Sequence, residues 1–194
     1  MDLEKEDHTF GNRFDDPEGL YRVLYASSQR IGCFVETLAR FRVDVDMIAD
    51  LAMMENSEDD FTPFGAVRRD WVKERAIGSA DVHGEYADIY ALGWVARLRT
   101  VLASTALKLG MKDIDLSTLE SAEPRILTQK AGREAYAQGF DGVYYHSRYG
   151  HQIENWAIFE LEGFPLANTQ SRAITENDPD LIEAMRILGL EFVG

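Results

Sequence analysis

The sequence contains a single cysteine, Cys33, and no long apolar run. One cysteine excludes an internal disulfide framework and any all-cysteine zinc or iron–sulfur site. The apolar stretch over residues 94–109 is interrupted by Arg97, Arg99 and Lys108, so it cannot provide the roughly 20 apolar residues of a membrane span. The first ten residues are acidic and lack the apolar core of a signal peptide. These absences predict a cytoplasmic protein that does not enter a membrane.

Basic residues are also scarce, with 20 Lys and Arg against 34 Asp and Glu, a net charge of −14 at pH 7. The excess lies in residues 1–62 (−9) and 173–194 (−4), whereas residues 63–172 carry only −1. Broad binding to a nucleic-acid backbone needs a basic face, so we do not expect it. A few arginines could still hold a small anionic ligand, and the acidic surface favours a basic protein partner.

The remaining composition is that of one folded domain. Hydrophobic residues make up 45% of the 194 positions, as in an ordinary folded protein. A typical domain has about 150 residues, so this length corresponds to one domain. Apolar periodicity predicts helices and short strands in alternation. The expected helices cover 29–42, 46–54, 66–75, 91–109, 115–121, 128–137 and 180–188. The expected strands cover 20–26, two paired pieces within 75–90, 142–146, 156–161 and 171–175. We therefore predict a single α+β domain with small, mostly antiparallel sheets.

The helix expected over 29–42 carries the clearest apolar stripe, and Ser27 or Ser28 is its expected N-cap. The stripe is formed by Ile31, Phe34, Val35, Leu38 and Phe41. At 100° per residue, Glu36 lies about 160° from the centre of this stripe. The Glu36 carboxylate is therefore expected to face away from the core.

Common catalytic and nucleotide-binding signatures are missing. Neither phosphate-binding glycine motif, G-x-G-x-x-G or G-x-x-x-x-G-K-[ST], occurs, and the serine hydrolase motif G-x-S-x-G is absent too. His146, His151 and Glu154 have suitable metal-binding groups, but their spacing matches no known ligand pattern. We predict no metal site, with polar residues of a loop between two strands as the simpler interpretation.

Five separated segments occur in an order that carries more information than any one of them. They are Gly11-Asn12-Arg13-Phe14 with Pro17, Tyr25-Ala26-Ser27, Glu36, Asp141-Gly142-Val143 with Ser147-Arg148, and Trp156-Ala157-Ile158-Phe159. This order resembles the RES domain family, which shows a G-x-R-[FW]-[ND]-x-P loop and a Y-[LA]-[AS] strand end. The family also has a glutamate eleven residues after that tyrosine and a late D-G-[IV]-x-[YF]-x-S-R strand. The resemblance covers about residues 11–190, so a short polar segment, 1–10, would precede a RES-like domain, 11–194.

The resemblance implies a fold similar to that of ADP-ribosyltransferases, with two small sheets clasping NAD. It also implies a toxin of a toxin–antitoxin pair that destroys NAD by hydrolysis or phosphorolysis. NAD would be a substrate, so no resident cofactor is expected. An antitoxin protein would be the partner, and the oligomeric state stays open.

Residue roles follow from the same resemblance. Glu36 would stabilise the positive charge that develops on the ribose, and Arg13 would give bidentate hydrogen bonds to the pyrophosphate. Tyr25 would stack on nicotinamide or bind a ribose hydroxyl, and Ser147 would contact the amide or the ribose. Ser27 and Arg148 are the further residues expected to bind NAD.

Each of these residues also has a purely structural interpretation. Glu36 precedes Arg40 by four residues and could form a helix surface pair. Arg13 could pair with Asp15 or Asp16, Tyr25 could be a half-buried sheet residue, and Ser147 could begin a turn.

The chain also departs from the family at its start. Most members have a further strand before the glycine–arginine loop, and here only residues 1–10 precede it, with His8 as the one candidate ligand contact. This departure motivates one alternative to a NAD-cleaving enzyme, a module that binds NAD or ADP-ribose without cleaving it. The fold class implied by the resemblance adds a second, an ADP-ribosyltransferase acting on a protein.

Overall fold

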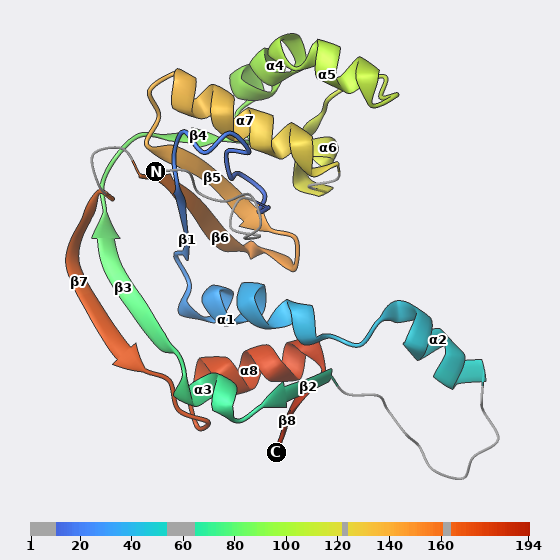
Figure 1. Ribbon diagram of the computed structural model, residues 1–194, viewed down its shortest axis with the longest axis vertical. Coiled ribbons are helices and arrows are strands. Elements are labelled where there is room, and N and C mark those ends of the chain that lie inside the picture. The colour runs from blue at the N-terminus through green and yellow to red at the C-terminus, as the bar shows by residue number, and fades with distance from the viewer. Residues whose placement is uncertain (1–10, 54–64, 122–123, 161–163) are drawn as a thin grey trace. The chain divides into compact units, whose positions relative to one another are not determined.

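A computed structural model describes residues 11–53, 65–121, 124–160 and 164–194 (Figure 1). The N-terminal segment with His8 and the acidic loop expected at 55–60 lie outside these residues. The helices are α1 (Arg30–Leu38), α2 (Val45–Met53), α3 (Asp70–Lys73), α4 (Leu92–Val101), α5 (Ala103–Lys108), α6 (Leu116–Ser121), α7 (Arg125–Ala137) and α8 (Pro179–Leu188), with a 3₁₀ turn at Ala39–Phe41. The strands are β1 (Val23–Ser27), β2 (Gly65–Arg68), β3 (Ala76–Val82), β4 (Tyr86–Asp88), β5 (Gly142–Ser147), β6 (Gly150–Phe159), β7 (Leu166–Ala173) and β8 (Leu190–Val193).

The predicted α+β class is confirmed, because helices accompany three small, separate sheets. A four-stranded sheet has the order β1-β6-β5-β4, and β2 pairs with β8 and β3 with β7. The strand pairs β1–β6 and β5–β6 are antiparallel, whereas β2–β8 and β4–β5 are parallel. Figure 1 shows β3 and β7 running in opposite directions.

The chain forms two compact units, each built from discontinuous segments. Of the described residues, the first combines 11–28, 82–121, 124–160 and 164–167, and the second combines 29–53, 65–81 and 168–194. The segments that resemble the RES motifs lie in the first unit, with the exception of Glu36.

The first unit packs helices against one face of the four-stranded sheet (Figure 1). Strand alternation directs Val143 and Tyr145 of β5, and Ala157 and Phe159 of β6, toward this face. They join one buried cluster with Leu98 of α4, Leu119 of α6, and Leu127, Ala131 and Ala135 of α7. The glycines that were expected to end helices, Gly110 and Gly139, have φ values of 73° and 84°.

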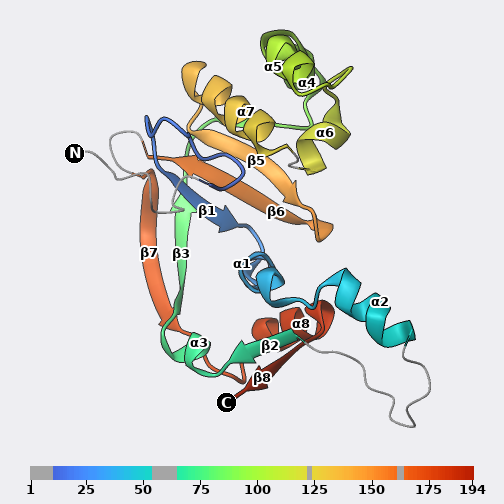
Figure 2. The same cartoon turned by 45° about the vertical axis from the view of Figure 1, so that its right-hand side comes forward.

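The second unit packs α1 against α8 (Figure 2). The predicted stripe of α1 buries Phe34, Val35 and Leu38, and α8 buries Leu181, Ala184, Met185 and Leu188. Asp178 is the N-cap of α8, where its carboxylate accepts from the Asp180 and Leu181 amides, and it also pairs with Arg30 of α1. One carboxylate thus begins α8 and ties it to α1.

Three local expectations are wrong. Residues 66–75 form strand β2 and the single-turn helix α3 instead of one helix. The strands within 75–90 exist, but they do not pair with each other, because β3 pairs with β7 and β4 with β5. The segment before Trp156 is the first half of β6 rather than a polar loop, and β8 was not expected at all.

The expected N-cap of α1 is also wrong. The N-cap residue is Gln29, and it makes no side-chain cap hydrogen bond. Ser27 Oγ donates instead to the Glu154 carbonyl (2.9 Å), and Ser28 Oγ accepts from Trp156 Nε1 (2.9 Å). Contacts with β6 therefore replace local capping.

Candidate functional site

The loop that carries Arg13 is held by the Tyr25 hydroxyl. This hydroxyl, on β1, donates to Asp15 Oδ1 (2.8 Å) and accepts from the Phe14 amide (2.9 Å). Asp15 Oδ2 in turn accepts from the Asn12 amide (2.8 Å). Asn12 and Phe14, the neighbours of Arg13, are thus both linked to Tyr25, Asn12 through Asp15 and Phe14 directly. These hydrogen bonds restrict the conformations of the loop.

The Arg13 side chain is itself directed by three contacts within the first unit. Its Nη2 donates to the Leu119 carbonyl in α6 (2.6 Å), and its guanidinium carbon lies 4.7 Å from the ring centroid of Tyr145 and 5.2 Å from that of Phe14. A planar cation stacked on aromatic rings has a defined orientation. The side chain is partly exposed, which suits an arginine that binds an anion from solution.

Helix α7 supports the same loop from another side. Arg125 donates to the Gly11 carbonyl, and Gln129 donates to the Asn12 carbonyl (3.3 Å). Arg133 forms an ion pair with Asp16 (2.6 Å), whose side chain is 0% exposed. These contacts come from one face of the helix, since the residues are spaced by four.

Gly132 of α7 lies on this same face. A Cβ at this position would be 3.0 Å from the Phe14 carbonyl oxygen, so the absence of a side chain permits the close approach of helix and loop.

Polar residues share a row of the sheet with Tyr145, whose ring contacts Arg13. Ser27 of β1 pairs with Asn155 of β6, and Asn155 pairs with Tyr145 of β5, so these three residues form one row across the sheet. The Asn155 side chain is buried, at 2% exposure. Because the proton of Ser27 Oγ is directed to the Glu154 carbonyl, this hydroxyl can offer a ligand only its lone pairs.

Ser147 and Arg148 lie at the turn between β5 and β6. A bulge shifts the register between His146 and Ser147, and the buried Ser147 Oγ accepts from the Tyr149 amide (3.0 Å). Ser147 therefore does stabilise a turn, while its hydroxyl proton donates to no other described residue. Arg148 is exposed and donates to the Tyr149 hydroxyl (2.8 Å).

Glu36 belongs to the second unit. It lies on the exposed side of α1, away from the stripe that packs on α8, as the periodicity predicted. Arg13, Tyr25, Ser27, Ser147 and Arg148 therefore lie in the first unit, and Glu36 lies in the second.

The group considered as metal ligands is spread over other contacts. His146 Nε2 lies 2.9 Å from the Tyr144 hydroxyl, which donates to Glu154 (3.2 Å), and His151 lies 3.8 Å from Glu120. Within residues 11–53, 65–121, 124–160 and 164–194, no three His, Cys, Asp or Glu side chains gather in a way that could hold a metal ion. Over the same ranges, no helix is both long and apolar enough to cross a membrane.

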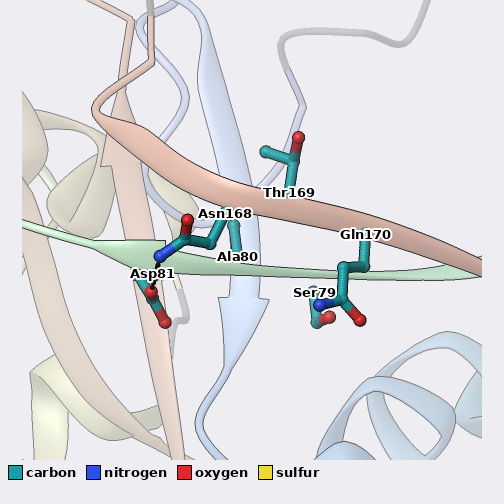
Figure 3. Close-up of a pocket in the computed structure, with 6 residues that line it drawn as sticks. All are labelled: Ser79, Ala80, Asp81, Asn168, Thr169 and Gln170. Carbon is teal, nitrogen blue, oxygen red and sulfur yellow. Dashed lines mark hydrogen bonds between the residues drawn. The ribbon is translucent and has the colours of Figure 1, made fainter.

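A shallow, open hollow of about 520 Å³ lies over the β3–β7 ribbon (Figure 3). It is lined by Ser79, Ala80, Asp81, Asn168, Thr169 and Gln170. Asn168 Nδ2 donates to Asp81 Oδ2 (2.6 Å), so these polar groups satisfy each other across the ribbon. None of the predicted site residues lines this hollow.

Fold and site define an α+β protein in which an arginine on a restrained loop stacks on Tyr145, a ring in the same row of the sheet as Ser27 and Asn155. Its family is shown by a match to the model of the RES domain over residues 4–175, most of the chain. The chain belongs to the RES domain family. Membership is consistent with a module that acts on NAD in a toxin–antitoxin setting. No curated protein and no solved structure gives a significant match.

Sequence reasoning missed three residues that shape this site: Asp15, Tyr145 and Asn155. One signal was available for Asn155, because it is a polar residue at an inward position of the alternating stretch Ile153 to Ala157. The contact of Tyr145 with Arg13 joins distant segments, which spacing along the chain does not reveal. The contacts of Asp15 with Asn12 and Tyr25 are near in sequence, but they depend on how the loop folds back on β1.

Proposed function

We propose that this protein cleaves NAD at the bond between nicotinamide and ribose, by hydrolysis or phosphorolysis. The observation that carries the proposal is a partly exposed arginine, Arg13, on a loop restrained by the Tyr25 hydroxyl, in a chain of the RES family. An arginine held in one orientation suits a pyrophosphate, because the planar guanidinium can give two parallel hydrogen bonds to it. NAD serves as substrate, and no resident cofactor is included in the proposal.

Bond cleavage leaves positive charge on the ribose, as in other glycoside cleavages. A carboxylate near the ring lowers the free energy of that transition state, and this is the role we assign to Glu36. Its role rests on the family spacing from Tyr25 and on the exposure of its carboxylate on α1. Ser147 retains a hydroxyl proton that can donate to the nicotinamide amide or to a ribose hydroxyl, and Arg148 can approach a phosphate from the adjacent turn.

The biological setting that we propose is that of a cytoplasmic toxin held in check by an antitoxin protein. NAD cleavage would deplete a central metabolite, so an inhibitor would be needed. The net charge of −14 favours an antitoxin with a basic contact surface.

The test follows nicotinamide release from NAD by purified protein, with and without phosphate, for the wild type and Glu36→Gln. Loss of charge stabilisation is expected to lower turnover by about a hundredfold or more, while the fold is kept because Glu36 is exposed. Glu191→Gln, an exposed change on β8, is the matched control and should retain full turnover. Phosphate dependence distinguishes phosphorolysis from hydrolysis.

Other outcomes lead to other functions. Unchanged turnover in Glu36→Gln would remove this residue from the mechanism. Stabilisation by NAD without nicotinamide release would indicate a binding module, since a ligand of the native state raises the melting temperature. Labelled NAD that leaves its ADP-ribose on protein would indicate a transferase.

A further inference from the structure

The Tyr25 hydroxyl both donates and accepts a hydrogen bond within the protein. A phenol has one proton to donate, and here that proton goes to Asp15, while the oxygen accepts from the Phe14 amide. Burial, reinforced by the Asp15 carboxylate, raises the pKa of this hydroxyl above its ordinary value. The hydroxyl therefore stays protonated across the physiological range and keeps donating to Asp15.

Asp15 connects that hydroxyl to the other side of the loop. Its side chain is almost fully buried, at 4% exposure, and each of its oxygens accepts a different hydrogen bond, one from Tyr25 and one from the Asn12 amide. Arg13 lies between Asn12 and Phe14, the two residues whose amides are held. A change in the backbone conformation on either side of Arg13 therefore breaks a partly buried hydrogen bond.

We propose that Asp15 and Tyr25 are positioning residues, which hold the backbone on both sides of Arg13 and thereby direct its guanidinium at the anionic part of the ligand. This inference rests on the proposed function and changes the role of Tyr25 within it. Tyr25 acts through Arg13, and its hydroxyl makes no hydrogen bond to NAD. Asp15, to which the family resemblance assigned no role, becomes part of the site.

The functional test is a double-mutant cycle on the KM for NAD. Tyr25→Phe removes only the hydroxyl and is expected to raise KM by about tenfold with little change in kcat, because Arg13 is then less well oriented. Arg13→Ala raises KM further. The double variant should be no worse than Arg13→Ala alone, since Tyr25 has nothing left to position.

Two further variants make the cycle specific. Asp15→Asn keeps one acceptor oxygen and loses the other, so its KM is expected between those of the wild type and Tyr25→Phe. Tyr86→Phe is the matched control: it removes another hydroxyl of the first unit, one whose buried oxygen has no hydrogen-bond partner among the described residues. It should leave KM and kcat unchanged.

Amide hydrogen exchange tests the restraint without any ligand. The Phe14 amide should exchange at least about tenfold faster in Tyr25→Phe than in the wild type or Tyr86→Phe, because it loses its acceptor. Unchanged exchange of Phe14 would overturn the proposal. So would effects of Arg13→Ala and Tyr25→Phe that multiply in the double variant, since Tyr25 would then act independently of Arg13.

Failure of the proposed function is visible separately. If the wild type releases no nicotinamide but binds NAD by calorimetry, the cleavage proposal fails and the same cycle is measured on Kd. If it neither cleaves nor binds NAD, the positioning role is overturned together with the proposed function, even where the exchange data show the restraint.

Discussion

The guanidinium carbon of Arg13 lies 4.7 Å from the centre of the Tyr145 ring. The Tyr145 ring forms part of the buried cluster of the first unit. The long Arg13 side chain therefore packs on a ring that is itself fixed by the core. The contact joins a residue of the N-terminal loop to the middle of β5, about 130 residues later in the chain. The core that stabilises this unit therefore also orients its candidate ligand-binding cation.

Removing that ring should weaken NAD binding. We expect Tyr145→Leu to raise the KM for NAD by about fivefold, as a cation–π contact contributes roughly 0.5–2 kcal/mol. Tyr145→Phe keeps the ring and should have a smaller effect. Val143→Ala, a change in the same buried face of β5, serves as control: it should lower stability by about 2 kcal/mol without raising KM. Equal KM values for Tyr145→Leu and the control would contradict the role of the ring.

Two helical glycines should respond in opposite ways to alanine. Alanine favours a helix by up to about 1 kcal/mol over glycine. At Gly93 of α4 a Cβ would meet nothing within 4 Å, so Gly93→Ala is expected to raise the melting temperature. At Gly132 of α7 the Cβ would lie 3.0 Å from the Phe14 carbonyl oxygen and 3.1 Å from the Tyr21 hydroxyl. Gly132→Ala should therefore lower it.

The same glycine pair separates stability from function. Because Gly132 faces the loop that carries Arg13, its alanine variant should also raise the KM for NAD, whereas Gly93→Ala should not change it. Melting curves and kinetics on the two purified variants suffice. A Gly132→Ala protein with a higher melting temperature and normal kinetics would show that helix and loop can separate at little cost.

The ion pair between Arg30 and Asp178 predicts how stability depends on pH. The hydrogen bond from Arg30 lowers the pKa of Asp178 below its ordinary value. A lowered pKa in the folded state means that the stabilisation is complete above the unfolded pKa, about 3.9, and is lost as the pH falls through the folded value. Asp178→Asn keeps an N-cap but removes the charge, so it should cost about 1 kcal/mol at pH 7.

Urea unfolding at pH 7, 5 and 3 checks this prediction. The difference between wild type and Asp178→Asn should persist at pH 5 and shrink toward pH 3. Glu183→Gln, which breaks the exposed pair with Arg186 within α8, should lower stability at pH 7 much less than Asp178→Asn does. A difference for Asp178→Asn that stays constant down to pH 3 would show that the charge contributes nothing.

Local patterns were enough for the elements that pack through one clear face. The stripe of α1 predicted both its burial and the exposure of Glu36, because a helix with a single apolar face has one way to pack. Strands β3 and β7 gave no comparable signal, since both are largely exposed and begin about 90 residues apart. The alternation of apolar and polar residues along a strand does not identify which other strand it pairs with.

The candidate site divides in the same way. Motif spacing selected Arg13, Tyr25 and Ser147 as candidates. The role first expected for Tyr25 took no account of Asp15 and Phe14 as its hydrogen-bond partners. The expected cap at Ser27 or Ser28 failed for a similar reason, because β6 competes for both hydroxyls. Competition of this kind depends on contacts made only after the sheet has formed.

Among the ion pairs of the described residues of the first unit, the pair between Arg133 and Asp16 should lower stability most when it is broken. Asp16 has a fully buried side chain, and it also accepts from the Leu20 amide (2.7 Å). Arg133→Ala would leave this carboxylate without its cation in a place that water does not reach. The expected loss of stability is about 3 kcal/mol, because an uncompensated buried charge costs far more than a surface pair contributes.

Chemical unfolding of Arg133→Ala measures this cost, and Arg186→Ala is its matched control. Arg186 pairs with Glu183 on an exposed helix face, so its removal should lower stability far less than the removal of Arg133 does. Arg133 also helps to hold the loop that carries Arg13, so the variant should raise the KM for NAD while it remains folded. Equal losses of stability in the two variants would mean that water or another cation compensates Asp16 once Arg133 is gone.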